Sequence, residues 1–213
     1  MCKYSKIPSP AIERLALYSR PLEALLGSAP PVISSEKLAK LCGVSPAQVR
    51  KDLAYFGEFG VRGVGYDARA LLREIKKILA TDREWTLCIV GIGNLGSALV
   101  ENENFRIRGY KFVAAFDADA KKAGKTLPCG LVIEPATRIR ELVRLLRIQI
   151  GVITTPLYEA QRVADLLKDA GVKAILNFAS TQVRAPEYCV VENVDFTVKI
   201  ENLAYHLGKI PLS

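Results

Sequence analysis

Three glycines and an aspartate have the residue types and the spacing of a dinucleotide-binding site. Gly91, Gly93 and Gly96 fit the pattern G-x-G-x-x-G, whose glycines permit a tight turn, a close approach of backbone to a pyrophosphate and close packing of a helix on a strand. Asp117 follows Gly96 by 21 residues, where a carboxylate accepts a hydrogen bond from a ribose 2′-hydroxyl and repels a 2′-phosphate. We therefore predict NADH and NAD+ as ligands rather than their 2′-phosphorylated forms. The predicted loop comprises Gly91, Ile92, Gly93, Asn94, Leu95 and Gly96.

The residues around this loop predict the strand, turn and helix that such a site requires. Residues 85–90 form an apolar run of strand length, residues 94–102 fit a crossover helix, and residues 111–116 fit a second strand that Asp117 ends. The helix would direct its first N–H groups, which carry partial positive charge, at the phosphates. The alternative interpretation is a glycine turn without a ligand beside a solvated aspartate, and the strand context favours the nucleotide site.

Two further strands are predicted to bring polar residues to the same edge of the sheet. Residues 148–154 and 174–178 are apolar, and a helical pattern over residues 158–170 separates them. Ligands of doubly wound sheets bind beyond the carboxyl ends of the strands, so we place the residues at these two ends beside the nicotinamide. They are Thr154, Thr155, Pro156, Asn177 and Phe178. After the strand over 111–116, Lys121 and Lys122 are predicted to lie in a solvated excursion.

The first eighty residues carry a pattern typical of a helix-turn-helix. A helix is expected to begin at Ser9, and Ser34-Ser35 and Ser45 begin two shorter helices that a three-residue turn containing Gly43 joins. Val49, Leu53 and Phe56 of the last helix are predicted to face the core. Its other face leaves Gln48, Arg50 and Lys51 free for the major groove, where glutamine and arginine make bidentate contacts with base edges.

Residues 56–66 predict a β-hairpin wing after these helices. The segment contains four glycines interleaved with apolar residues, and Arg62 at its tip is placed to enter a minor groove. Tyr66 either contacts the DNA backbone or packs against its own domain. The alternative is a helical dimerisation module with a glycine loop. The predicted DNA-binding residues are Ser45, Gln48, Arg50, Lys51, Arg62, Gly63 and Tyr66.

Charge and composition support a nucleic-acid partner for the first part of the chain. Of the net charge of +8, residues 1–80 carry 13 basic against 7 acidic side chains, or +6, which leaves +2 for residues 81–213. Half of the chain is apolar, which argues against disorder. We expect a cytoplasmic protein without a membrane segment, because no apolar run has the length of a span and no signal peptide is recognisable. The five scattered cysteines predict neither disulfides nor a metal site.

These patterns predict an α/β protein with three parts. Residues 1–80 form a winged helix-turn-helix domain, residues 84–195 form a Rossmann domain with a doubly wound parallel sheet, and residues 196–213 form a C-terminal helix. Ile200, Leu203, Ala204 and Leu207 make an apolar stripe on that helix. The stripe packs either on its own domain or against a second subunit, and the second interpretation suits the two-fold symmetry of DNA readers.

The sequence does not favour an enzyme. A dehydrogenase needs a general acid or base and a domain that holds the substrate, whereas the single histidine, His206, lies in the terminal helix and no catalytic domain is inserted. The competing classes are an NAD-dependent oxidoreductase with an appended helical domain and a winged-helix repressor that answers a different nucleotide.

Nearly the whole chain resembles the Rex family of redox-sensing transcriptional repressors. The run from Gln48 to Tyr66 is long and specific for that family. The matching stretches are residues 47–53, 55–60, 62–66, 91–96, 116–119, 175–179 and 193–195. The resemblance implies a homodimer with swapped C-terminal helices, which binds a palindromic operator in double-stranded DNA when NADH is low and releases it when NADH rises.

The same resemblance implies roles for individual residues. It places Arg50 and Lys51 in the major groove, Arg62 in the minor groove and Asp117 on the adenosine ribose. It places Phe196 of one subunit near the nicotinamide pocket of the other. Arg20 and Asp195 match positions that exchange partners across the domain interface between the two states. This chain has Asn102 where the family usually has a tyrosine of that switch, and Ser180 where proline is usual.

Overall fold

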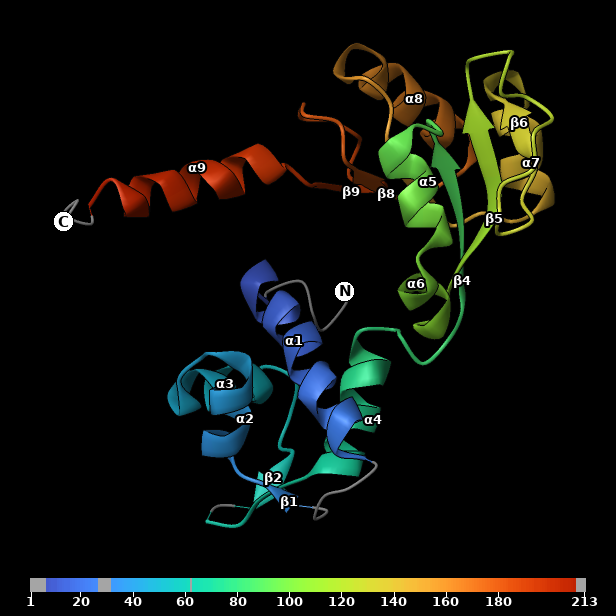
Figure 1. Ribbon diagram of the computed structural model, residues 1–213. Coiled ribbons are helices and arrows are strands. Elements are labelled where there is room, and N and C mark those ends of the chain that lie inside the picture. The colour runs from blue at the N-terminus through green and yellow to red at the C-terminus, as the bar shows by residue number, and fades with distance from the viewer. Residues whose placement is uncertain (1–6, 27–31, 62, 210–213) are drawn as a thin grey trace. The chain divides into compact units, whose positions relative to one another are not determined.

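The computed structural model describes residues 7–26, 32–61 and 63–209. The chain divides into two compact units, Met1–Arg83 and Glu84–Ser213. Figure 1 shows the elements of each unit, and each unit is described by itself.

The N-terminal unit combines four helices with a small antiparallel sheet. The helices are α1 (Ser9–Leu25), α2 (Ser35–Cys42), α3 (Pro46–Ala54) and α4 (Ala68–Ile78). The strands β1 (Val32–Ile33), β2 (Gly60–Val61) and β3 (Gly65–Asp67) pair in the order β1-β3-β2. The predicted helix-turn-helix and hairpin wing are therefore confirmed. Strand β1 was not predicted, because two residues are too short to show a period.

Side-chain caps fix where three of these helices begin. The Oγ atoms of Ser34 and Ser45 and the carboxylate of Asp67 accept backbone N–H groups at the first turns of α2, α3 and α4, which satisfies donors that have no partner within the helix. Helix α1 differs from the prediction. Its N-cap is Pro8, in an extended conformation and without a side-chain hydrogen bond, so Ser9 is already helical.

One apolar cluster holds the N-terminal unit together. Leu15 and Leu22 of α1 pack with residues of all three other helices and with Ile33. Along α1, Ala11 and Tyr18 are fully buried, whereas Ile12 is 42% exposed. The hydroxyl of Tyr18 donates a hydrogen bond within the core, which allows a polar ring to occupy a position that periodicity assigns to aliphatic residues.

The C-terminal unit is built on a parallel sheet of six strands. The strands are β4 (Trp85–Val90), β5 (Tyr110–Asp117), β6 (Ile133–Pro135), β7 (Ile150–Ile153), β8 (Ala174–Asn177) and β9 (Val190–Asn193). All neighbours pair in parallel in the order β6-β5-β4-β7-β8-β9. In chain order this is 3-2-1-4-5-6, the strand order of the Rossmann fold, with its topological switch between β4 and β7.

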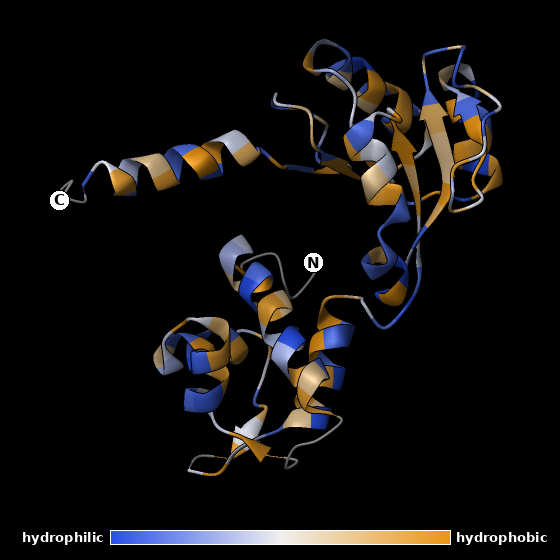
Figure 2. Ribbon diagram, in the orientation of Figure 1, coloured by the Kyte–Doolittle hydropathy of each residue, from blue (hydrophilic) through white to orange (hydrophobic). Residues whose placement is uncertain are grey.

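Apolar residues cover both faces of this sheet. Along β4 the side chains alternate between two cores: Cys88 and Val90 belong to one, and Leu87 and Ile89 belong to the other. Figure 2 shows the hydrophobic residues running along the central strands. The connecting helices are α5 (Asn94–Glu101), α6 (Glu103–Ile107), α7 (Ile139–Leu145), which follows a short 3-10 turn η1 (Ala136–Arg138), and α8 (Leu157–Ala170). Burial on both faces is typical of doubly wound folds and explains the continuous apolar runs.

Two elements of this unit were not expected. Helix α6 begins where the backbone of Asn102 becomes extended, and the Asn102 side chain caps it by accepting the N–H of Asn104. Asn102 therefore ends one helix and starts the next. Strand β9 adds a sixth strand that alternates between exposed and half-buried residues.

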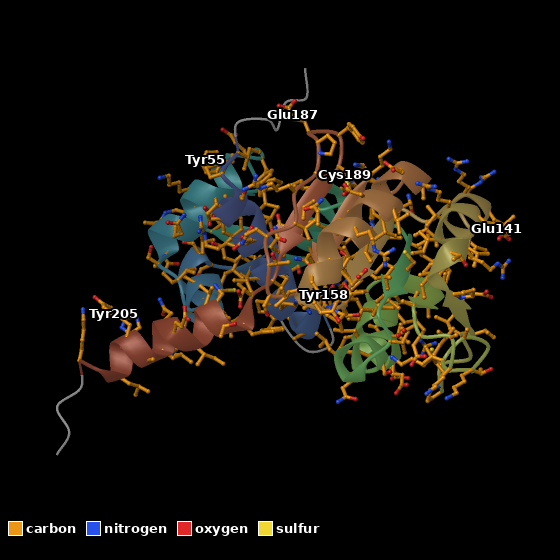
Figure 3. The ribbon with its side chains drawn as sticks, turned by 90° about the horizontal axis from the view of Figure 1, so that it is seen from above. Tyr55, Glu141, Tyr158, Glu187, Cys189 and Tyr205 are labelled. Carbon is orange, nitrogen blue, oxygen red and sulfur yellow. The ribbon has the colours of Figure 1, made fainter. Side chains whose placement is uncertain are left out.

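Helix α9 (Phe196–Leu207) ends the described chain, and none of its residues is buried. Ile200, Leu203 and Leu207 are each more than 60% exposed, and Tyr205, labelled in Figure 3, projects from the helix into solvent. The interpretation that the apolar stripe packs on its own domain is therefore wrong. No described helix is long and apolar enough to cross a membrane.

Candidate nucleotide and DNA sites

The glycine loop between β4 and α5 divides into two structural glycines and one open position. At Gly91, where φ is 101°, a Cβ atom would come within 2.9 Å of the Thr154 backbone, and at Gly96 it would come within 2.2 Å of the Gly91 oxygen. A Cβ atom at Gly93 would meet nothing within 4 Å. Gly91 and Gly96 are thus required by packing, whereas Gly93 leaves free space over the loop at the start of α5. A phosphate needs such space in order to approach the backbone.

The side chain of Asp117 joins the end of β5 to the glycine loop. Its Oδ2 accepts the N–H of Ile92 at 2.8 Å, and its Oδ1 accepts the N–H of Asp119 at 2.8 Å. Burial by itself would raise the pKa of this carboxyl. Hydrogen bonds from Asp119, Lys122 and Ile92 outweigh burial and hold the pKa below its ordinary value. Asp117 is therefore ionised at neutral pH and lies beside the loop, as an acceptor for a ribose must.

Lys122 corrects an expectation from the sequence. The predicted solvated lysine donates from Nζ to Asp117 Oδ2 at 2.9 Å and to the carbonyl oxygen of Ile92 at 3.0 Å. The turn after β5 folds back and brings the ammonium group to the glycine loop. Sequence reasoning missed this residue because nothing in a run of lysines and alanines shows which of them turns inward. Lys121 is exposed, as predicted.

The two threonines after β7 have different roles. Thr154 Oγ1 donates to the carbonyl oxygen of Gly91 at 2.6 Å and so ties the glycine loop to the neighbouring strand. Thr155 Oγ1 is inaccessible to solvent and has no hydrogen-bond partner in the part of the chain that the structure describes. Buried hydroxyls are rarely left without a partner, so Thr155 Oγ1 is a candidate hydrogen-bonding group of this site. Pro156 follows as the N-cap of α8.

Asn177 ends β8 and Phe178 follows it, and the two side chains differ in whether they are free to contact a ligand. The amide of Asn177 is fully buried: its Nδ2 donates to Thr181 O and Asn193 Oδ1, and its Oδ1 accepts the N–H of Ala179. Asn177 therefore braces the following loop and offers no free amide to a ligand, contrary to the expectation. The Phe178 ring stacks on Phe196, with 6.0 Å between the ring centroids. Both rings belong to one chain, whereas the resemblance places Phe196 at the pocket of the other subunit.

These features together fit an NAD-type dinucleotide. Gly93 leaves room for a pyrophosphate at a helix start, Asp117 offers an ionised carboxylate to a ribose, and the Thr155 hydroxyl awaits a partner at the end of β7. The three groups lie at the carboxyl ends of β4, β5 and β7, on both sides of the topological switch. This is where a Rossmann sheet binds its cofactor. Within the described residues, no cluster of His, Cys, Asp or Glu side chains has the composition of a metal site.

The N-terminal unit contains a buried ionic network that sequence reasoning missed. Asp52 of α3 has no solvent exposure and accepts Arg14 Nε at 2.6 Å, Arg14 Nη2 at 2.8 Å and Tyr18 Oη at 2.7 Å. Burial alone would raise the pKa of Asp52, but the bonds from Arg14, Tyr18 and Gln48 lower it below its ordinary value. The network locks α1 to α3. The only sign of this network in the sequence is an acidic residue between Lys51 and Leu53, and a solvent-exposed aspartate would give the same pattern.

The structure corrects the expectation that Gln48 is free for base contacts. Its Nε2 donates to Asp52 Oδ1 at 2.7 Å, so the amide faces the network. Arg50 Nη1 donates to Ser35 Oγ at 2.9 Å, and its side chain remains 55% exposed. Lys51 is exposed. Arg50 and Lys51 are thus the basic side chains that α3 presents, while the Ser45 hydroxyl caps the helix.

The wing lies beside α3 and forms a groove with it. Residues of α3, of the N-terminal end of α2 and of the hairpin line this groove, among them Arg50, Phe59 and Tyr66. Tyr66 packs against the apolar core, and its ring would lie 2.6 Å from a Cβ atom at Gly60. Of the two interpretations of Tyr66, the structure shows packing. Gly63 is exposed with φ at 82°, and Arg62 lies outside the described residues.

The three predicted switch residues occur in both units. Arg20 is exposed on α1. Asp195 caps α9 by accepting the N–H and the hydroxyl of Thr197, and these bonds lower its pKa. Asn102 caps α6 and lines a cavity of about 690 Å³ with Phe105 and Phe112. The residue that stands in place of a tyrosine therefore has a local structural role.

Comparisons with known proteins agree with the geometry of both units. Residues 6–54 match the family described as "Putative DNA-binding protein N-terminus", and residues 82–181 match the family described as "CoA binding domain". The chain is 55% identical to the redox-sensing transcriptional repressor Rex of Syntrophobacter fumaroxidans, over 97% of this chain and 98% of that protein. It is 46% identical to the repressor of the same name from Desulfitobacterium hafniense, again over 97% and 98%.

Solved structures show the same likeness in three dimensions. RSP, a Rex-family repressor, in complex with NAD+ and operator DNA superposes with a TM-score of 0.91 at 32% identity, over 96% of this chain and 94% of that one. The complex of RSP with NADH superposes with a TM-score of 0.85 at 30% identity, over 96% of each chain.

Proposed function

Because the chain belongs to the Rex family of redox-sensing transcriptional repressors, we propose that it binds operator DNA as a homodimer and is released when NADH binds its Rossmann domain. One observation carries the proposal. A single chain joins a winged helix to a Rossmann sheet whose glycine loop, carboxylate and orphan hydroxyl fit a dinucleotide. RSP was solved both with NADH and with NAD+ and operator DNA, which supports the same pair of ligands here.

The nucleotide half of the proposal assigns a part of the cofactor to each group. The loop over residues 91–96 binds the pyrophosphate, and Asp117 accepts hydrogen bonds from the adenosine ribose. Thr155 meets a polar group of the nicotinamide half, because its hydroxyl is buried without a partner among the described residues. NAD+ binds the same pocket with less effect, since its ring carries a positive charge into an apolar site beside Phe178.

The coupling between the two ligands requires a difference in affinity between two conformations. If NADH binds the released form ~100-fold more tightly than the DNA-binding form, it supplies about 2.7 kcal/mol of bias. The DNA half uses Arg50 and Lys51 of α3 in the major groove and Arg62 of the wing in the minor groove. Arg20, Asn102 and Asp195 are proposed as the groups whose contacts differ between the two states.

Helix α9 supplies the proposed dimer contact. The large apolar and aromatic side chains of α9 are 55–65% exposed, and apart from the stacking of Phe196 on Phe178 its own unit buries none of them. A helix with such a stripe is stabilised by a partner surface, and exchange of this helix between two copies brings two winged helices under one two-fold axis.

We propose further that this regulator works in the cytoplasm and catalyses no reaction. At the nucleotide site the ionisable side chains of Asp117 and Lys122 are bound to each other and to the backbone, and His206 lies in α9. The rival proposal, an NAD-dependent oxidoreductase, predicts turnover. Incubation with NADH and a panel of carbonyl substrates, followed by absorbance, should show no oxidation of NADH, and sustained oxidation would support the rival.

The function is tested by titrating the protein with nucleotides in the presence and absence of operator DNA. Calorimetry should show that NADH binds more tightly than ATP, which separates this proposal from a repressor that answers a different nucleotide. DNA binding, followed by fluorescence anisotropy, should weaken as NADH is added. A protein that binds NADH but holds DNA equally well at every NADH concentration would contradict the proposed regulation.

A further inference from the structure

The guanidinium group of Arg50 is held at the wall of the groove between α3 and the wing. Arg50 Nη1 donates a hydrogen bond to Ser35 Oγ at 2.9 Å, and Glu36 Oε1 lies 3.7 Å from the same nitrogen. All three residues line the groove, and Ser35 and Glu36 belong to the first turn of α2. The contact therefore joins the helix that carries Arg50 to the helix before it.

The carboxylate of Glu36 fixes the direction of the Ser35 hydroxyl. Ser35 Oγ donates its single hydrogen to Glu36 Oε1 at 3.3 Å, so its lone pairs are left to accept from Arg50. Hydrogen bonds from the backbone N–H of Glu36 and from the Ser34 hydroxyl hold the pKa of Glu36 below its ordinary value, and the carboxylate is ionised at neutral pH. The three side chains form a chain of hydrogen bonds in which each bond polarises the next.

The held guanidinium keeps one edge free for a ligand. A guanidinium has five N–H groups, and Ser35 accepts one of those on Nη1. The Nε and Nη2 groups of Arg50 have no acceptor in the part of the chain that the structure describes, and the side chain is 55% exposed. Two N–H groups in one plane match the O6 and N7 atoms of guanine, which arginine binds in a bidentate contact. The contact with Ser35 thus restricts the side chain without occupying that edge.

An acidic side chain in this groove would otherwise oppose DNA binding, because a carboxylate repels phosphates. The groove contains two of them, Glu36 and Glu58. Glu36 contacts Ser35 and Arg50, whereas Glu58 is exposed and makes no hydrogen bond or ion pair with another described residue. The two carboxylates therefore differ in their contact with the arginine, and Glu58 is a matched control for the effect of charge alone.

We propose that Ser35 and Glu36 are positioning residues that orient Arg50 for base recognition, and that they thereby increase the preference of this protein for its operator over other DNA. A long side chain loses rotational freedom when it is immobilised at an interface, and a guanidinium that is already held in one orientation loses less. The inference rests on the proposed function, because it assumes that α3 contacts the bases of operator DNA. It adds two residues of α2 to those that determine sequence specificity.

A contact that only competes with DNA makes the opposite prediction. If Ser35 holds Arg50 away from the bases, their hydrogen bond breaks on binding, and its removal strengthens operator binding. If Ser35 orients Arg50, its removal weakens operator binding and leaves the affinity for unrelated DNA unchanged. The quantity to measure is therefore the specificity ratio, defined as the dissociation constant for unrelated DNA divided by that for the operator.

The experiment uses the full chain and two duplexes of equal length, one that the unaltered protein selects from random-sequence DNA and a scrambled version of it. Fluorescence anisotropy at one fixed salt concentration, without NADH, gives the specificity ratio. Ser35→Ala, which changes no charge, should lower the ratio about threefold or more through weaker operator binding. Glu36→Gln should also lower it about threefold, because affinity for the scrambled duplex rises more than affinity for the operator. Glu58→Gln should leave the ratio within about 1.5-fold, since its repulsion is independent of sequence.

A double-mutant cycle separates orientation of Arg50 from damage to α2. Ser35→Ala made in an Arg50→Ala background should change the operator dissociation constant by less than about 1.5-fold, whereas damage to the helix would weaken binding in either background. An unchanged or raised ratio in Ser35→Ala would overturn the inference, as would an equal loss with and without Arg50.

Glu36→Gln decides if Ser35→Ala fails to fold, because the Glu36 side chain is 68% exposed and its replacement leaves the core intact. A specificity ratio in Glu36→Gln equal to that in Glu58→Gln would contradict the proposal. Failure of the unaltered protein to select any DNA sequence contradicts the proposed function itself, which is a separate outcome.

Discussion

Replacement of Asp52 should release the recognition helix α3 from α1 and weaken operator binding without touching the nucleotide site. The Asp52 carboxylate is fully buried and joins Arg14 and Tyr18 of α1 to Gln48 of α3. Asp52→Ala leaves four donors of these side chains, two of Arg14 and one each of Tyr18 and Gln48, without their acceptor. The arginine charge then has no counter-ion in the interior of the unit.

The structure sets the size of the effect. Removal of one partner of a fully buried ion pair costs about 3–5 kcal/mol. Because the Arg14 side chain is 26% exposed, water can solvate part of its charge, and we expect the free energy that opens α3 to fall by about 3 kcal/mol, the lower end of that range. Tyr18→Phe removes one hydrogen bond to a charged group and should cost about 1.5–3 kcal/mol. Lys51→Ala, at an exposed neighbouring position, should change the opening free energy of α3 by at most about 0.5 kcal/mol.

The assay must report on the N-terminal unit alone. The single tryptophan, Trp85, lies in the other unit, so its fluorescence does not follow α3. Native-state hydrogen exchange, read by mass spectrometry on peptides of α3, gives the opening free energy directly. Peptides of β4 and β7 serve as the internal control, and their protection should not change.

The acid sensitivity of α3 provides an independent check. The pKa of Asp52 is lowered in the folded chain, so its contribution to stability is complete above the ordinary carboxyl pKa of about 4 and is lost as pH falls through the lowered value. In Asp52→Asn that loss should disappear. Equal protection of α3 in Asp52→Ala and in the unaltered protein would refute the account of the network, whatever happened to DNA binding.

Three further predictions concern the nucleotide site and the dimer. Gly93→Ala should fold normally but weaken NADH binding by about tenfold or more, because its Cβ meets no protein atom within 4 Å and enters the phosphate space. Gly96→Ala, whose Cβ would lie 2.2 Å from the Gly91 oxygen, should lower the melting temperature. A Gly93→Ala protein that melts at a lower temperature than Gly96→Ala would contradict the loop geometry. Thr155→Val should leave the melting temperature within about 2 °C while NADH affinity falls, and calorimetry that shows full affinity would remove Thr155 from the site. Deletion of residues 197–213 should give a monomer in analytical ultracentrifugation, and a truncated chain that still sediments as a dimer would contradict the role of α9.

The sequence predicted the features that depend on local backbone conformation, helix capping and burial pattern. The tight glycine loop, the capping serines and the apolar runs of a sheet buried on both faces each leave a local mark, because glycine spacing, helix caps and burial act on residues close in the chain. The strand order could be expected once the fingerprint was recognised. The strand β1 and the helix α6 were missed because they contain too few residues to show a period.

Contacts between side chains that lie far apart in the sequence could not be predicted. Asp52 lies 38 residues from Arg14, and a single aspartate on a polar helix gives no sign of burial. Lys122 donates a hydrogen bond to Ile92 of the glycine loop, 30 residues earlier in the chain. The amide of Asn177 donates to Thr181, in the loop that follows β8. In each case the tertiary fold determines which residue is the hydrogen-bond partner. The residue type shows that a side chain is polar, but it does not show which partner that side chain contacts.

The central claim is that nucleotide occupancy of the Rossmann unit controls DNA binding by the winged helix. The direct measurement is an operator-binding titration at a fixed total concentration of nicotinamide nucleotide, with the NADH fraction varied from zero to one. The account predicts that the fraction of DNA bound falls as the NADH fraction rises, and that Gly93→Ala flattens this response while it retains full binding at zero NADH. Operator binding that stays constant across the whole range in the unaltered protein would contradict it.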